Sequence, residues 1–266
     1  MATKTPTAKP AAKSAALKAT PGAASTSVAV KKPNAGNIVS IQDALRAQVA
    51  NMAGRIMPAT GNAIRVSQDK QISLPDGTKV EGALELVIVD FVAVHNFYEG
   101  KFDKNDIKPP SCFAIGTDPR NMVPSPNSPN KQASECQTCP MNQWGSDGKG
   151  KACKNGRKLA VLPPDANEDT PIWTLGVSPT AIKGFDGYVA GVARTFGMPP
   201  VAVVTTVDLN TATDFPQFIF GNAVQNDGVA AHFSRTAEAR ELLMVEPDVS
   251  GYEAPTRSPA KKVVRR

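Results

Sequence analysis

The chain has 266 residues, of which 41% are hydrophobic and 20% charged. This composition is ordinary for a globular protein and excludes disorder of the whole chain. The most apolar run, residues 83–94, contains Glu85 and Asp90 and is too short to cross a bilayer. The N-terminal residues include lysines but no apolar core of a secretory signal, so we expect a cytoplasmic protein.

The formal net charge of +6 is unevenly distributed along the chain. Residues 1–33 contain six lysines and no acid, and residues 254–266 contain five basic residues and no acid. The intervening body has 19 basic and 24 acidic residues, a net charge of −5. We therefore predict a disordered basic tail at 1–36, a single domain at 37–253 and a second disordered basic tail at 254–266. Such tails suit contacts with phosphates or acidic proteins, and a solubilising spacer is the alternative.

The first predicted element of the domain is a helix that Ser40 caps. Its apolar residues recur at helical spacing until Pro58 follows the last turn. Alternating residues predict a strand at 63–74, a turn at 75–78 and a second strand at 79–94. The apolar face of the helix consists of Ile41, Leu45, Val49, Met52 and Ile56.

Residues 100–157 show no sustained period and are rich in Pro, Asn, Ser, Gly and Lys. After them we predict strands at 158–162 and 172–177, and a helix that starts at Ser178-Pro179 and ends before Gly197. The remaining predicted elements are strands at 201–209 and 215–220 and a helix at 230–245. This order predicts an α+β fold with mainly antiparallel β structure. We expect an OB-like barrel or a sheet with flanking helices, carrying a zinc-stapled insertion at 108–158.

All four cysteines lie in the insertion, at Cys112, Cys136, Cys139 and Cys153. Four thiolates complete a tetrahedral zinc shell, and a C-x2-C pair is the usual way to supply two of them. Two disulfides, a redox C-x2-C pair and unrelated buried thiols are the alternatives. We expect one structural Zn²⁺. His95 and His232 are candidate substitute ligands, for which an ordinary core or surface role is the alternative.

The insertion is also basic, with eight basic and three acidic residues between 108 and 158. Clustered cations beside an aromatic residue suit contacts with single-stranded nucleic acid. The alternatives are a solvated lysine-rich hairpin, or lysines that offset the charge of the thiolates. Phe97 and Tyr98 follow the second strand and would stack bases or pack in the core. The nucleic-acid-binding candidates are Trp144, Lys149, Lys151, Lys154, Arg157, Lys158, Phe97 and Tyr98.

The sequence offers little for catalysis. The segment 145–152 matches G-x4-G-K but has Ala152 where a phosphate-binding loop needs Ser or Thr. With only two histidines, both far from any G-x-S-x-G elbow, a serine hydrolase is not expected. We therefore do not predict an enzyme, a small-molecule substrate or a membrane partner.

Several segments together resemble a group of tailed-bacteriophage proteins, namely 74–77, 87–91, 96–98, 109–113, 136–142, 144–146 and 148–154. That group comprises zinc-bearing single-stranded DNA-binding proteins of the oligonucleotide-binding-fold type, and the resemblance covers roughly residues 60–220. It implies that the four cysteines hold zinc and that the surrounding strands form a barrel. Phage single-strand binders often have an acidic tail that recruits replication partners, whereas residues 261–266 of this chain are basic.

These observations lead to two functional hypotheses, and a zinc-dependent nucleic-acid enzyme is a further alternative. The first is a non-enzymatic, zinc-stabilised binder of single-stranded DNA in phage replication or recombination, located in the host cytoplasm and partnered by replication or recombination proteins. The second is a phage structural or assembly protein, or an adaptor of a polymerase or recombinase, without a direct role on single-stranded DNA. The acidic body favours the second hypothesis, because it is a poor DNA surface unless its charges segregate.

Overall fold

The computed structural model describes residues 61–100, 103 and 105–254, together with the single positions 41, 44 and 48. Ile41, Ala44 and Gln48 are helical and exposed, and the rest of the helix predicted from Ser40 lies outside the described residues. Residues 1–36 and 255–266, which make up nearly all of the two predicted tails, also lie outside them. The chain divides into two compact units, residues 1–51 and 52–266, and the fold described below is that of the second.

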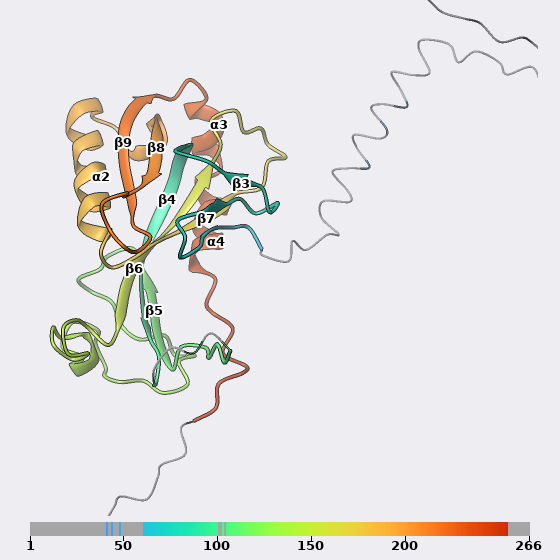
Figure 1. The fold of residues 1–266 in the computed structure, drawn as a ribbon. Helices are drawn as coiled ribbons and strands as arrows, with labels where there is room; N and C mark the ends of the chain where they lie inside the picture. Colours follow the sequence, from blue (N-terminus) through green and yellow to red (C-terminus); the bar gives the residue numbers. More distant parts are fainter. Residues whose placement is uncertain are drawn as a thin grey trace, which may run out of the picture. The chain divides into compact units, whose positions relative to one another are not determined.

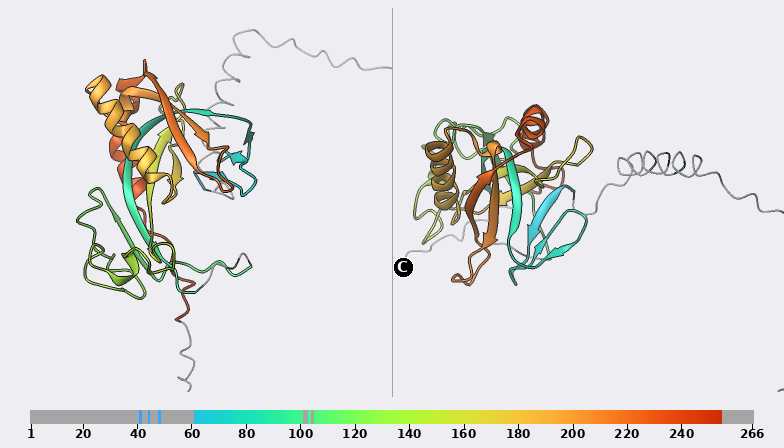
Figure 2. Two further views of the ribbon diagram at one scale, coloured as in Figure 1. Left: turned by 60° about the vertical axis from the view of Figure 1, so that its left-hand side comes forward. Right: turned by 90° about the horizontal axis from the view of Figure 1, so that it is seen from above.

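The second unit is an α+β structure built on one curled, mostly antiparallel sheet that forms a half-barrel (Figures 1 and 2). The strand order is β3-β2-β1-β7-β6-β4-β8-β9, with β5 paired to β4 outside this path. Among the strand pairs of the described residues, only β1–β7 is parallel. The predicted α+β class with mainly antiparallel strands is therefore confirmed. The strands are β1 (Ala63–Val66), β2 (Ile72–Ser73), β3 (Lys79–Val80), β4 (Leu84–Phe97), β5 (Cys112–Gly116), β6 (Lys154–Leu162), β7 (Trp173–Val177), β8 (Val203–Leu209) and β9 (Phe218–Gln225).

The long strand β4 organises the unit because it pairs with three other strands. Its first residues, 84–86, pair with β8, and residues 87–96 pair with β6. Its last residues, 93–97, pair with β5 on the other side. The described residues between β4 and β6 form a separate lobe at the far end of these strands (Figure 1). This segment, residues 98–153, is called the cysteine lobe, because it contains β5 and all four cysteines.

Two apolar clusters hold the helices on the sheet. Helix α2 (Ile182–Phe196) buries Phe185, whose ring packs edge-on against Phe91 of β4 and Phe220 of β9. Helix α4 (Thr236–Met244) buries Ala239 and Leu243 in a second cluster with residues of β4 and β6. The remaining helical elements are α3 (Val229–Ser234) and the short 3-10 turns η1 (Pro140–Asn142) and η2 (Pro200–Ala202). Within the described residues, no helix has the length and apolar character needed to cross a membrane.

The first two predicted strands are each divided by a turn. A turn at 67–70 interrupts the strand predicted at 63–74, and Lys70 adopts a positive φ of 58° there. The Lys70 ammonium reaches the carbonyl of Asn210, 3.1 Å away, in the connection between β8 and β9. In the strand predicted at 79–94, Gly82 breaks the extended backbone with a φ of 89°, which glycine adopts without strain. The contact of Lys70 with the β8–β9 connection and the positive φ of Gly82 thus accompany breaks in two segments that the alternating residue pattern predicts as continuous strands.

Two other strands differ from their predicted bounds because their partners extend them. The strand predicted at 158–162 begins earlier, at Lys154, since Asn96 and its neighbours on β4 pair with its first residues. The strand predicted at 215–220 is displaced and continues to Gln225, which pairs with Val203 at the start of β8. Cross-strand pairing, rather than the local pattern, sets these ends.

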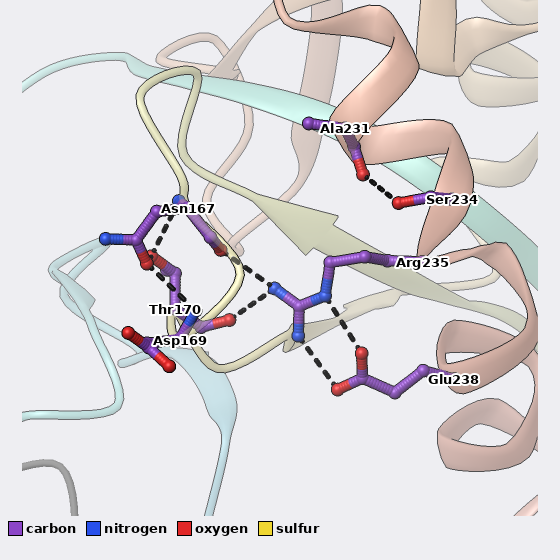
Figure 3. A network of polar contacts seen from close by, with 7 residues as sticks. All are labelled: Asn167, Asp169, Thr170, Ala231, Ser234, Arg235 and Glu238. Atoms are coloured by element: carbon purple, nitrogen blue, oxygen red, sulfur yellow. Dashed lines mark hydrogen bonds and ion pairs between the residues drawn. The ribbon is translucent and has the colours of Figure 1, made fainter.

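The helix predicted at 230–245 is divided into α3 and α4 at Arg235. The Arg235 guanidinium forms a paired contact with the Glu238 carboxylate at 2.8 and 2.9 Å. It also donates to the carbonyls of Asn167 and Thr170 in the β6–β7 connection (Figure 3). Arg235 therefore fixes a loop that is distant in the sequence, a requirement that helical periodicity does not reveal. By contrast, the helix predicted to end before Gly197 is confirmed as α2, although it begins a turn later than expected.

Candidate functional site

The four cysteines converge on one small cavity in the cysteine lobe. Cys112 begins β5, Cys136 and Cys139 lie in the following loop, and Cys153 immediately precedes β6. All four are buried and carry free thiols. The cavity they line has a volume of about 10 Å³, and His95 of β4 also lines it. By this measure the void has room for about one atom of the size of a water oxygen.

Backbone hydrogen bonds shape the loop that presents the C-x2-C pair. The amide N–H of Asn142 donates to the carbonyl of Cys139 at 3.0 Å, closing a tight turn around Pro140. The buried Asn142 side chain donates through Nδ2 to the Cys136 carbonyl at 2.7 Å. The N–H of Cys153 donates to the Met141 carbonyl at 2.8 Å, which brings another cysteine to the same turn. The fold of the lobe thus gathers thiols that are far apart in the sequence.

Two of the four thiols, those of Cys136 and Cys153, have raised pKa values. Burial, followed by the neighbouring Cys112 and Cys139, raises the pKa of Cys136 to about 11. Burial, followed by Cys136, Cys139 and Cys112, raises the pKa of Cys153 to about 12. Four anionic sulfurs in one small volume repel each other, so a cation among them is needed to stabilise the thiolate forms. A bound metal would supply that cation, since a coordinating thiol is deprotonated.

These residues match the donor set of a structural zinc site in number and type. Within the residues that the structure describes, however, no three His, Cys, Asp or Glu side chains stand close enough to be a metal-binding group as they are placed. The shared cavity, the free thiols and the raised pKa values of Cys136 and Cys153 indicate that the cysteines lie near one another, but their side chains are not in ligating geometry. The cysteines are therefore the residues that could hold a metal.

Trp144 stands on a hydrogen-bonded turn of the same lobe. It is 79% exposed, the largest fraction among the exposed large hydrophobic residues that the structure describes. The hydroxyl of Ser146 donates to the carbonyls of Met141 and Gln143 at 2.9 and 2.7 Å. Gly145 has a φ of 89°, a conformation that side-chain-bearing residues rarely adopt. The turn thus holds a large aromatic side chain in solvent, on the segment that also carries the cysteines.

The predicted lysines of the cysteine lobe and Lys154, the first residue of β6, differ in their contacts. Lys149 is exposed in the turn that the Asp147–Gly150 bridge closes. Lys151 is half-buried, with its Nζ 3.4 Å from Oδ1 of Asn142. Lys154 forms an exposed ion pair with Asp147 at 2.8 Å. Exposed pairs of this kind contribute little to stability, so the lysine can exchange its partner for another anion at low cost.

Arg157 and Lys158 lie in β6 rather than in a surface loop. Arg157 is buried, and its guanidinium pairs with Asp186 of α2 at 2.8 Å. Lys158 donates through Nζ to the Leu242 carbonyl near the end of α4, 3.1 Å away, and burial lowers its pKa. Both cations thus serve the packing of helices on the sheet, although the sequence predicted them as nucleic-acid contacts.

Phe97 and Tyr98 line an open groove of about 1,090 Å³ on the cysteine lobe. Lys154 lines the same groove, whereas Trp144 and Lys149 are not among the described residues that line it. The structure thus brings three of the predicted contacts together and places others apart. Carboxylates also line the groove, and Asp106 and Asp147 are each paired with a lysine. These acids were not part of the predicted contact surface, because the local sequence does not indicate which residues share a groove.

Two further buried residues, His95 and Asn142, lie beside the cysteines. His95 is 5% exposed, and its Nδ1 has no hydrogen-bond partner. Burial, followed by the charges of Lys151 and Arg157, lowers its pKa to about 4. Asn142 had no role in the sequence-based prediction, although its place directly after Cys-Pro-Met was a usable signal. His232 lies elsewhere, beside Asn226, and does not line the cysteine cavity.

Comparisons with known protein families, with curated proteins and with solved structures found no match. A function for this chain therefore has to be inferred from its own residues.

Proposed function

We propose that this protein binds single-stranded DNA through the surface of a zinc-stabilised cysteine lobe, and that its curled sheet is an OB-like half-barrel supporting that lobe. Cys112, Cys136, Cys139 and Cys153 would hold one structural Zn²⁺. The metal would supply no chemistry beyond fixing the lobe, because four protein ligands leave no open coordination position. Four buried cysteines around one atom-sized cavity support this assignment.

The observation that carries the DNA-binding proposal is the exposed Trp144 on its hydrogen-bonded turn. An aromatic face held in solvent offers a stacking platform to any base, which is how sequence-tolerant binders of single strands operate. Lys149 in the adjoining turn and Lys151 nearby would contact the phosphates. The lysine-rich segment at 1–33 would add contacts through release of counterions.

The groove would make only an auxiliary contact with the DNA. Tyr98 is 44% exposed there, so its ring is open to a base. The Lys154 ammonium would have to exchange Asp147 for a phosphate, and the groove carboxylates oppose phosphate binding. We therefore assign the main contact to the Trp144 turn and an auxiliary one to Tyr98, Phe97 and Lys154. Arg157 and Lys158 are not included, because packing contacts occupy both.

A titration of labelled oligo-dT with the full-length protein at several salt concentrations tests the proposal. Binding should weaken as salt rises, with a slope that reflects the number of phosphates contacted. Deleting residues 1–33 should reduce that slope without changing the melting temperature of the body. No binding at low salt, or an affinity independent of salt, would show that the proposed function is wrong.

The carboxylates of the groove favour a second candidate, an adaptor or assembly protein that binds a basic segment of another protein. Glu99, Asp103, Asp106 and Asp147 line the groove with Lys108 and Lys154. Such a lining suits Lys or Arg side chains on a partner. A partner that co-purifies after nuclease treatment would favour this candidate, and a partner lost on nuclease digestion would favour the DNA-binding proposal.

A further inference from the structure

His95 occupies a distinctive place at the end of the sheet. It lies on β4, the strand that runs between β5 and β6 at this level. Its cross-strand partners are Ala114 on β5 and Asn155 on β6. Cys112 lies two residues from Ala114, and Cys153 lies two residues from Asn155. Because side chains two apart on a strand share a face, His95 is a diagonal neighbour of Cys112 on β5, and Cys153 immediately precedes β6 on the other side.

The imidazole is buried without a hydrogen bond at Nδ1. Only 5% of the residue is exposed, and Nδ1 is among the few buried side-chain polar atoms of the described residues that lack a partner. Leaving a buried polar group unpaired is unfavourable, so a binding event that gave Nδ1 a partner would remove this penalty. His95 lines the same atom-sized cavity as all four cysteines. The sulfurs that line the same cavity are therefore candidate acceptors for it.

We infer that His95 is a positioning residue of the metal centre, which donates a ring N–H to the sulfur of Cys112 or Cys153 when Zn²⁺ is bound. The inference rests on the proposed zinc site. A ring N–H is present in either protonation state of imidazole, so this role needs no change in charge. Four thiolates around Zn²⁺ have a net charge of −2, and a donor aimed at one sulfur partly offsets that excess. Partners of this kind orient the ligands and tune metal affinity.

Asn155 provides the main competing arrangement and the matched control. Its Oδ1 is also buried without a partner, and it lies directly across from His95 in the β4–β6 pair. An N–H of His95 pointing to Oδ1 would satisfy both residues without involving the metal. In that case, removing either side chain should change the zinc affinity of the lobe by the same factor. If His95 instead donates a hydrogen bond to a cysteine sulfur, Asn155→Ala should leave metal affinity nearly unchanged.

Zinc affinity, measured by competition with a chromogenic chelator, tests the inference on the full-length chain. His95→Ala should weaken zinc binding about 10- to 100-fold, the usual effect of losing such a partner. His95→Gln, whose amide retains an N–H donor, should recover a large part of that loss. The absorption spectrum of the Co²⁺-substituted protein should keep its four-sulfur character in all variants, because His95 is not a ligand.

The outcomes separate this inference from the zinc proposal itself. Wild-type protein that binds no zinc would overturn the metal site, and the inference with it. Zinc binding by the wild type with unchanged affinity in His95→Ala would overturn the inference alone. Equal losses in His95→Ala and Asn155→Ala would also overturn it, in favour of the His95–Asn155 pair. A cobalt spectrum that changes in His95→Ala would show that the imidazole is a ligand rather than a positioning residue.

Discussion

Replacing Trp144 with alanine should separate DNA binding from folding. The residue is 79% exposed, so about a fifth of its surface is buried in the lobe. For an aromatic side chain this is about 50 Å², worth about 1 kcal/mol of hydrophobic stabilisation. Loss of one base–aromatic stack costs about 1–3 kcal/mol of binding free energy, equivalent to about 5- to 150-fold in affinity. Trp144→Ala should therefore weaken oligo-dT binding strongly and alter stability little.

Fluorescence anisotropy with labelled oligo-dT at low salt measures this effect, and thermal melting checks the fold. Ile107→Ala is the matched control, because Ile107 is 78% exposed on the same lobe but offers no ring to a base. Trp144→Phe should retain a large part of the affinity. If Trp144→Ala binds oligo-dT as tightly as the wild type, the stacking argument is refuted, whatever the effect of the lysines.

Three further predictions concern the fold that carries the lobe. Phe185→Ala should lower the free energy of unfolding by about 3–5 kcal/mol in urea titrations, because this fully buried ring packs between two others; a loss below about 1 kcal/mol would contradict the packing. Arg157→Met should lower the free energy of unfolding by about 1–3 kcal/mol in the same assay, since it removes a partner of Asp186. The folded variant should bind oligo-dT as the wild type does. Weaker DNA binding at equal stability would show that Arg157 belongs to the contact surface. Hydrogen bonds from Ser125 and Asn127 lower the pKa of Glu246, so the stabilisation is present above the ordinary pKa of Glu and is lost as the pH falls through the lowered value. Hydrogen-exchange protection factors around residue 125, corrected for the intrinsic pH dependence of exchange, should therefore fall on acidification in the wild type but not in Glu246→Gln, and parallel behaviour of the two proteins would count against this contact.

The elements that could be predicted from the sequence are those with local signals. Helix α2 follows from its apolar spacing and from Gly197 at its end, and it is confirmed. The four cysteines were expected to converge because four thiolates, two of them from a C-x2-C pair, complete one zinc shell, and they line one cavity. Whether that cavity holds zinc stays a prediction.

Other features depend on partners that are distant in the sequence. Arg157 and Lys158 belong to a run of cations that resembles a surface cluster, yet their partners are Asp186 and the end of α4. The break at Arg235 depends on carbonyls in the β6–β7 connection. The unpaired Nδ1 of His95 is a property of the packed sheet, because it follows from the placement of β5 and β6 beside β4. Local patterns contain no information about such contacts.

The metal content of the purified full-length protein tests the basis of the proposed function most directly. Elemental analysis should give about one zinc per chain, because four thiolates form one closed shell. Cys139→Ser should lower the zinc content and increase hydrogen exchange across residues 112–153, while α2 and the sheet remain protected. Wild-type protein that contains no zinc, takes none up and still protects the lobe amides would contradict the proposed zinc-stabilised lobe.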